Sequence, residues 1–387
     1  MKRILIISPY FPFPARDGGK VRLYNLIKHL SKDNEIYLLA YIEPGADKSC
    51  VSLAEEFCSG VFPVIREEEK RIIGEDIPRC VSFFYTQAMI DKLEQVLKKV
   101  NPDIVQLDFL IMTQYVKHIS RVPVFYTEHD MGLLDFNQSF HDRDLGDNER
   151  FFEWKKLVRY EKKILDYFHS VIVLTQRDKK LIENLNKSVK ATIIPTGVDT
   201  DFYVPNVYND TEEKSLVFVG HYKHYPNTDA IVYFVNKIFP KIVEKKSNIK
   251  LYVVGSGLTK AVESLKSDNI IVTGEVEDIR KFLKRPNIFV APVRLGGGIK
   301  GKVLEAMAMG VPVVASKEAV RGIDCFAEKY ALVSDDTEVF ANNVVKLLQN
   351  NDLYASLSGY GRKIVEENYN WKTIAEKLNR FYCEKLK

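Results

Sequence analysis

Short apolar runs rich in Ile, Val and Leu recur along the chain and alternate with segments whose apolar residues return at helical spacing. The runs are continuous rather than alternating with polar residues, which is typical of parallel strands covered on both faces. In the first half, strands are predicted at residues 3–8, 35–41, 103–108, 122–128, 170–175 and 191–195. Helices are predicted between them, including residues 21–30, 88–100 and 149–168. This alternation predicts a doubly wound α/β domain.

The pattern pauses at a polar segment near residues 197–214 and then begins again. The second set of predicted strands is 215–220, 249–255, 270–273, 287–292, 311–315 and 331–334. An amphipathic helix is predicted at the end of the chain, where Trp371 precedes Ile374, Leu378, Phe381 and Leu386. We therefore expect two Rossmann-like domains, residues 1–197 with the C-terminal helix 367–387, and residues 198–366. A ligand is expected in a cleft between them, outside the carboxyl ends of the strands.

The composition is that of an ordinary globular protein, with 46% apolar residues, 28% charged residues and a formal net charge of +4. This charge is too small to indicate nucleic acid as a partner, although a local basic face could meet anionic lipid. The five cysteines are scattered without a Cys-x-x-Cys pair, which favours a reducing compartment and no structural metal. The first apolar run stops at Ser8 and Pro9, and no run approaches the ~20 residues of a membrane span. A cytoplasmic protein is expected, with at most peripheral membrane contact.

A glycine-rich loop between two predicted strands is the most informative stretch of the chain. It contains Gly296, Gly297 and Gly298, and a helix is predicted to begin near Gly301 or Lys302. Consecutive glycines let the backbone approach a ligand, and the amides at a helix start favour an anion. The cationic side chains nearby are Arg294, Lys300 and Lys302. The loop is therefore a candidate diphosphate site.

Glu305 follows Lys302 by three residues and is expected in the first turn of this helix, on the same face. A carboxylate in that place could accept hydrogen bonds from ribose hydroxyls. The alternative is a helix N-terminus that carries ordinary solvated charges, with Glu305 only favouring the helix dipole.

Residues 292–316 closely resemble the donor-binding loop of glycosyltransferase family 4, whose members share the two-domain GT-B fold. Other segments agree in order and spacing, and the resemblance covers nearly the whole chain. Residues 218–227, 253–257 and 272–276 resemble the strand–loop units of the donor domain, residues 194–199 its hinge, and the region of Trp371 its C-terminal crossover helix.

The resemblance implies that Glu305 binds the nucleotide ribose and that the backbone of Val276 meets the base. The family often has a first glutamate at the position of Gly297, so the sugar would be held here by amides of Gly296–Ile299 or by another side chain. The family's arginine and lysine after the first donor-domain strand are not cleanly matched. Gly220 and Lys223 stand in that loop, and Lys300 and Lys302 are the preferred phosphate ligands.

Two loops of the first half are further candidates. Gly18 and Gly19 follow the first strand and could approach the donor, although an ordinary loop has the same sequence; Asp17 could orient an acceptor hydroxyl or cap the helix. His129 stands where the resembling family has a histidine facing the donor sugar, although a lone histidine can be purely structural. Glu128 and Asp130 are candidate acceptor-side carboxylates.

The predicted helix 149–168 mixes aromatic and basic residues. Such a mixture suits a membrane surface that carries a lipid-linked acceptor, but aromatic residues at helical spacing more often pack into a core, which is the interpretation favoured here. The acidic and basic run at 67–71 is predicted to be a solvated helix end rather than a metal site.

The resemblance implies a retaining transferase that needs no bound metal ion or other cofactor and moves a sugar from a nucleotide diphosphate donor to a saccharide or polyprenyl-linked acceptor. Polysaccharide or glycan biosynthesis is the expected context. Two alternatives stay open, a nucleotide-sugar 2-epimerase of the same architecture and a non-catalytic nucleotide-sugar-binding partner of another transferase. A hydride-transfer function is disfavoured, because the glycine pattern that begins at Gly255 has Lys260 at its third glycine position.

Overall fold

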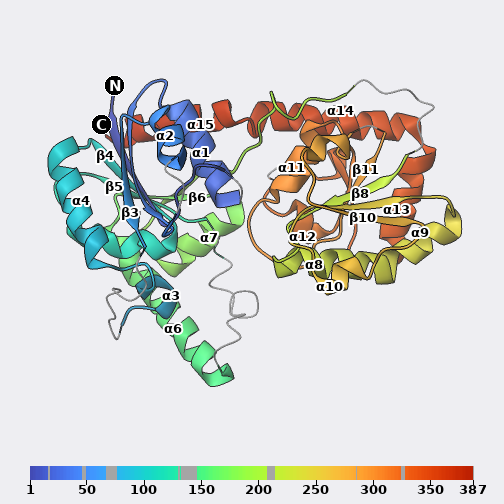
Figure 1. The fold of residues 1–387 in the computed structure, drawn as a ribbon, viewed down its shortest axis with the longest axis horizontal. Coiled ribbons are helices and arrows are strands. Elements are labelled where there is room, and N and C mark those ends of the chain that lie inside the picture. Colours follow the sequence, from blue (N-terminus) through green and yellow to red (C-terminus); the bar gives the residue numbers. More distant parts are fainter. Residues whose placement is uncertain are drawn as a thin grey trace. The chain divides into compact units, whose positions relative to one another are not determined.

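The computed structural model describes residues 1–15, 18–45, 49–66, 76–129, 131, 146–206, 214–284, 286–323 and 327–386. The chain forms two compact units, Met1–Pro195 with Ile374–Lys387, and Thr196–Thr373. Residues 367–373 therefore belong to the second unit. In Figure 1 the first unit runs from blue to green and ends with red helix α15, and the second runs from yellow-green to red.

The first unit is built on a seven-stranded parallel sheet with the order β3-β2-β1-β4-β5-β6-β7. Its strands are β1 (Arg3–Ser8), β2 (Glu35–Ile42), β3 (Gly60–Ile65), β4 (Ile104–Asp108), β5 (Val124–Thr127), β6 (Ser170–Val173) and β7 (Ala191–Ile193). The chain order reverses direction across the sheet between β1 and β4. In doubly wound folds this switch point is where ligands bind.

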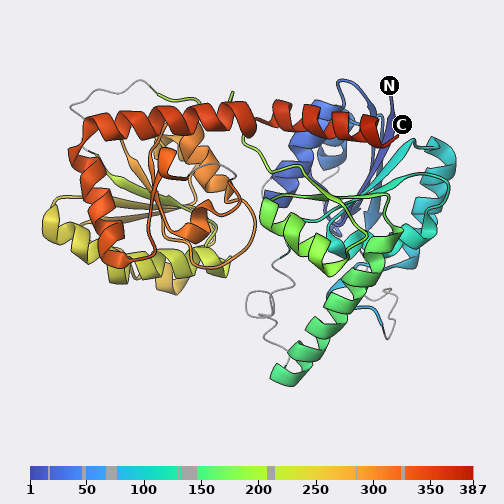
Figure 2. The same cartoon turned by 180° about the vertical axis from the view of Figure 1, so that it is seen from behind.

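Helices cover both faces of this sheet, as Figures 1 and 2 show. They are α1 (Gly18–Leu30), α2 (Ser49–Glu55), α3 (Arg79–Ser82), α4 (Gln87–Val100), the 3₁₀ helix η2 (Leu110–His118), α6 (Asp147–Ile164), the 3₁₀ turn η4 (Leu165–Tyr167), α7 (Gln176–Leu185) and α15 (Trp371–Lys385). Leu93 on α4 and Leu157 on α6 are almost fully buried, as expected for the inner faces of helices that cover a sheet.

The amphipathic pattern at the end of the chain is confirmed, because Ile374, Leu378 and Phe381 of α15 are buried. Tyr382 is fully buried and donates its hydroxyl to the side-chain oxygen of Gln106 on β4. Leu386 departs from the pattern, since it lies beyond the helix and is 39% exposed.

The second unit has a six-stranded parallel sheet with the order β10-β9-β8-β11-β12-β13. Its strands are β8 (Leu216–Val219), β9 (Leu251–Val254), β10 (Ile270–Gly274), β11 (Ile288–Ala291), β12 (Val313–Ala315) and β13 (Ala331–Val333). Here the switch point lies between β8 and β11. Both sheets confirm the predicted pair of Rossmann-like α/β folds.

The helices of the second unit are α8 (Tyr225–Tyr233), the π-helical turn η5 (Phe234–Ile238), α9 (Phe239–Lys245), α10 (Lys260–Glu263), η6 (Ile279–Lys281), α11 (Gly301–Ala308), α12 (Lys317–Val320), η7 (Ala327–Lys329), α13 (Thr337–Gln349) and α14 (Asn351–Asn368). One apolar core runs through this unit and includes Phe218, Phe289 and Leu304, none of which is exposed. Among the described residues, no helix is both long enough and apolar enough to cross a membrane.

Candidate functional site

The glycine-rich loop follows β11 and lies beside the loop that follows β8, at the switch point of the second sheet. The two loops meet where Pro226 approaches Gly296: a methyl group built on Gly296 would lie 3.9 Å from the proline ring. The loop after β9 packs more tightly on the loop after β8. A side chain on Gly255 would clash with the carbonyl oxygen of Gly220, so the loop after β9 depends on a residue without a side chain.

The Lys300 side chain holds the glycine loop in place through hydrogen bonds to its backbone. Its ammonium donates to the carbonyl oxygens of Gly296 at 2.9 Å and Gly297 at 2.7 Å, and more weakly to that of Gly298 at 3.4 Å. In a trans peptide the N–H points opposite to the C=O, so the amides of Gly297, Gly298 and Ile299 point away from Lys300. Lys300 therefore acts on the loop itself and turns a row of amide donors outward. Such a row is an anion-binding nest.

Helix α11 begins directly after this loop, and Lys300 is its N-cap residue. The first turn contains no acidic residue, although acids normally favour this position because of the helix dipole. Glu305 is the fifth residue of α11, so the prediction that it lies in the first turn is wrong. Helix α11 begins at Gly301, one of the two predicted starts, and Glu305 then falls just beyond the first turn. An N-terminus with lysines and without acids is suited to bind an anion.

The Lys302 ammonium lies between polar and aromatic partners in a partly buried place. It donates to the side-chain oxygen of Asn227 on α8 and lies 4.9 Å from the ring centroid of Phe218 on β8. Burial and, to a smaller extent, the nearby Lys300 together lower the pKa of Lys302 to about 7, against the opposing effect of Glu305. A cation held in such a place gains most from a bound anion.

Glu305 is partly buried one turn further along α11. Burial raises the pKa of its carboxyl group, against the opposing effects of Lys302 and of a hydrogen bond from the Tyr203 hydroxyl. The two side chains of α11 that were predicted as site residues therefore do lie close to one another, and Tyr203 fixes the carboxylate from the other side.

Arg294 is already engaged within the protein. It forms a two-point ion pair with Asp229, at 2.6 and 3.1 Å, and stacks over the ring of Tyr233 at 4.1 Å. A phosphate would have to compete with Asp229 for this guanidinium.

The other predicted donor residues surround the same loops. Lys223 is exposed, and its aliphatic part reaches Gly257 in the loop after β9. Val276 and Ile299 are partly buried and pack against the core, which anchors the loops that carry them.

In the first unit, the candidate residues follow β1, β4 and β5, three neighbouring strands. Gly18 and Gly19 are the first residues of α1. Asp17 and Asp130 lie outside the described residues, as does the 67–71 run.

His129 is held firmly at the end of β5. Its Nε2 lies 3.0 Å from a carboxylate oxygen of Asp108 at the end of β4, and its ring stacks on Phe109 with centroids 3.8 Å apart. Only 9% of the histidine side chain and 2% of the aspartate side chain are exposed. A buried carboxylate fixes the ring orientation of a histidine.

Glu128, the neighbour of His129, lies inside the unit. It is 3% exposed and accepts a hydrogen bond from the Tyr126 hydroxyl inside the unit. Glu161 of α6 is buried close by, and burial together with the charge of Glu128 raises the pKa of Glu161. The structure thus places Glu128 in an internal acidic pair rather than on an open face.

Comparisons with known proteins agree on one family. Residues 16–202 match the family described as Glycosyltransferase Family 4, and residues 213–350 match Glycosyl transferases group 1. The chain belongs to the family 4, or group 1, glycosyltransferases.

The relatives of this glycosyltransferase include proteins with named activities. A phosphatidyl-myo-inositol mannosyltransferase of Mycobacterium leprae is 30% identical over 50% of this chain and 53% of its own. The capsular polysaccharide biosynthesis glycosyltransferase CapM of Staphylococcus aureus is 26% identical over 61% of this chain and 67% of its own. A solved structure of the Anabaena protein Alr3699/HepE with UDP has a TM-score of 0.68, with 13% identity, and covers 99% of this chain and 100% of its own. This last likeness confirms the fold.

Sequence reasoning missed three residues of the glycosyltransferase that hold the candidate side chains: Tyr203 beside Glu305, Asn227 beside Lys302, and Asp108 beside His129. Only Asp108 carried a signal, because it is a polar residue at the end of a predicted strand. Within the described residues, no group of three or more His, Cys, Asp or Glu side chains could hold a metal ion.

Proposed function

We propose that this glycosyltransferase moves a sugar from a nucleotide diphosphate donor to a saccharide or lipid-linked acceptor, with retention at the anomeric carbon. The observation that carries the proposal is the pairing of Lys302 with the outward-facing amides of the glycine loop at the switch point of the second unit. The diphosphate leaving group gains negative charge as the glycosidic bond breaks. Donors fixed at that place lower the barrier more than donors that bind substrate and transition state equally.

The remaining roles come from the family resemblance, and the contacts of Glu305 with Tyr203 and of His129 with Asp108 support two of them. Glu305, fixed by Tyr203, would accept hydrogen bonds from the ribose, and the backbone at Val276 would meet the base. Amides of the Gly296–Ile299 segment would hold the sugar, because the position of the family's first glutamate is Gly297. His129, oriented by Asp108, would donate to the sugar from the first unit.

The proposal includes no obligatory metal ion. A divalent cation commonly neutralises the leaving diphosphate in nucleotide-dependent enzymes, and Lys302 with the loop amides can supply that neutralisation here. Turnover should then persist in the presence of EDTA. A polysaccharide or glycan pathway in the cytoplasm is the proposed context, supported by the named activities of the M. leprae and S. aureus relatives.

The test begins with the donor. UDP- and GDP-sugars are screened for thermal stabilisation, since a ligand of the native state raises its melting temperature. The stabilising donor is then incubated with and without acceptors, and the product anomer is assigned by NMR. Epimerised donor without an acceptor would replace the proposal by a 2-epimerase, and binding without turnover on any acceptor would favour a non-catalytic partner.

Replacing Lys302 should separate chemistry from folding. Lys302→Ala is expected to lower kcat/KM by at least about 100-fold, the usual effect of losing one donor to the developing charge. The melting temperature should stay close to that of the parent, because a partly buried cation adds little stability. Lys346→Ala, which removes an exposed charge from the last turn of α13, is the matched control. Parental activity in Lys302→Ala would exclude the proposed role of this residue.

A further inference from the structure

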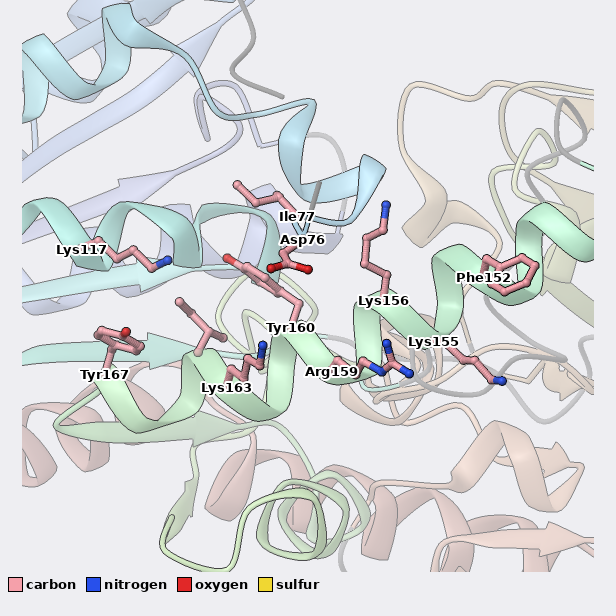
Figure 3. Close-up of a pocket in the computed structure, with 11 residues that line it drawn as sticks. Asp76, Ile77, Lys117, Phe152, Lys155, Lys156, Arg159, Tyr160, Lys163 and Tyr167 are labelled. Carbon is pink, nitrogen blue, oxygen red and sulfur yellow. The ribbon is translucent and has the colours of Figure 1, made fainter. Parts of the chain in front are cut away.

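A cavity of about 490 Å³ opens on the first unit, between α6, the end of η2 and the segment Asp76–Ile77. Figure 3 shows its lining side chains, most of which come from α6. We call this cavity the α6 groove. Its lining residues are Asp76, Ile77, Lys117, Phe152, Lys155, Lys156, Arg159, Tyr160, Lys163, Ile164 and Tyr167.

The α6 groove has a strong excess of positive charge. Five of its lining residues are lysine or arginine, and Asp76 is the one acid that faces them. Lys156 is paired with Glu153 at 2.8 Å. Within the described part of the chain, Arg159 and Lys163 have no carboxylate partner, and both are exposed. Several uncompensated cations on one surface attract a polyanionic partner.

Exposed aromatic side chains border the same cations. Phe152 is 67% exposed and Tyr167 is 56% exposed, at the two ends of the groove. Phe151, which precedes Phe152 in the chain and does not line the groove, is 40% exposed. The prediction that the aromatic residues of this helix pack into a core is confirmed for Tyr160 and Phe168, which contact buried apolar clusters, and is wrong for Phe151 and Phe152. Large apolar side chains gathered at the surface mark an interaction site.

The spacing of these residues gives α6 two different faces. Phe152, Lys155 and Lys156, Arg159 and Lys163 recur at three- and four-residue intervals and so share one side of the helix. Leu157 and Glu161 are buried on the other side. The N-terminal half of α6 extends beyond the sheet of its unit (Figures 1 and 2), so the aromatic end of the groove lies on a projecting element.

We propose that the α6 groove docks the protein on a bilayer that contains anionic phospholipids. The cations would bind lipid phosphates, and Phe152 and Tyr167 would enter the interface between headgroups and acyl chains. A small soluble anion would account for the charges but leave the exposed aromatic rings without a role. The inference goes beyond the proposed sugar transfer, because docking requires neither donor nor acceptor.

The experiment is vesicle sedimentation of the full chain. Vesicles of phosphatidylcholine alone are compared with vesicles of equal parts phosphatidylcholine and phosphatidylglycerol. Binding is expected only to the anionic vesicles, and it should weaken as salt is added. The triple variant Lys117→Ala/Arg159→Ala/Lys163→Ala should bind on the order of 100-fold more weakly, at about fivefold for each charge near the surface.

A matched control removes three exposed lysines of the same unit that lie outside the groove: Lys32→Ala/Lys98→Ala/Lys190→Ala. Its net charge equals that of the groove variant, so equal losses in both would overturn the proposal in favour of nonspecific attraction. Unchanged binding in the groove variant would also overturn it. Stabilisation by inorganic phosphate without any vesicle binding would identify a small-anion site instead.

Tryptophan fluorescence gives a local readout. The chain has two tryptophans, Trp154 on α6 and Trp371, which is 2% exposed. Trp154 stands two positions after Phe152 and so lies off the groove face, and the variant Phe152→Trp/Trp154→Phe moves the reporter into the groove. Anionic vesicles should shift the emission of this reporter to shorter wavelength. Donor binding by the groove variant should equal that of the parent, because the candidate phosphate-binding residues belong to the second unit. The vesicle test therefore stays valid even if the proposed sugar transfer fails. If the protein sediments with the anionic vesicles but the tryptophan emission does not shift, α6 is excluded as the docking element.

Discussion

Three features of the surroundings of Lys302 disfavour a positive charge. Lys302 is partly buried, it lies in the first turn of a helix, where the dipole repels positive charge, and Lys300 is nearby. Burial and the nearby Lys300 lower the pKa of Lys302 to about 7, so near neutral pH the group is close to its titration point. A bound diphosphate opposes these effects, because its negative charge favours the charged form of Lys302.

Binding of a nucleoside diphosphate should therefore take up a proton. About one pH unit above the pKa of Lys302, most free protein has a neutral amine, and bound diphosphate should raise that pKa and recharge the group. Affinity is then expected to fall as the pH rises from 7. Calorimetry with UDP or GDP in buffers of different ionisation enthalpy measures the uptake.

Lys302→Arg is the control, because arginine keeps its proton throughout this range. It should bind without net proton uptake if the guanidinium is accommodated. Equal uptake in the parent and in Lys302→Arg would assign the proton to another group and contradict the pKa argument.

The candidate residues on the glycine loop could be predicted from sequence because they are consecutive along the chain. Their partners could not. Asn227 precedes Lys302 by 75 positions, and only the adjacency of β8 and β11 in the sheet brings the two together. Arg294 was predicted as a phosphate ligand, but the sequence could not reveal that Asp229 already pairs with it.

At the scale of the element, the glycine loop depends on two glycines and less on the third. Gly296 and Gly298 have φ values of 95° and 68°, whereas Gly297 does not have a positive φ. Gly298→Ala should therefore strain the loop by about 1–2 kcal/mol and turn its amides away from the ligand. Donor affinity in a titration should fall, while Gly297→Ala should leave the loop geometry intact.

The comparison of these two alanines separates backbone strain from side-chain size, because both add the same methyl group. A larger loss of donor affinity in Gly297→Ala than in Gly298→Ala would contradict the observed loop conformation.

Elements buried on both faces were the easiest to predict. Strands β4 and β8 consist of continuous buried residues, and their short apolar runs predicted them as strands of a covered parallel sheet. Strand β3 was missed, because it lies at the sheet edge, exposes several residues and contains Pro63. Proline is tolerated at an edge, where a strand can lack a ladder hydrogen bond.

At the scale of the whole molecule, every candidate phosphate ligand belongs to the second unit, Thr196–Thr373. Nucleoside diphosphate without a sugar should thus slow hydrogen exchange in that unit, most strongly at residues 220–224 and 296–305. Exchange in β1 and β4 of the first unit should change little. Mass spectrometry of peptides after exchange, with and without UDP or GDP, measures this.

Lys302→Ala tested in the same way should lose the protection at residues 296–305 under equal ligand concentration. Protection centred on the first unit, with none at the glycine loop, would mean that the nucleotide binds elsewhere.

The first unit is completed by the last residues of the chain, and this limits how the protein can be divided. A fragment ending at Pro195 would lack the helix whose Tyr382 and Phe381 contact Gln106 and Phe125, and would leave that apolar surface bare. Lys2 lies 2.9 Å from Cys383, so both termini meet on this unit (Figure 1). A gene rearranged so that residues 374–387 precede Met1 through a short linker should therefore yield an independently soluble first half.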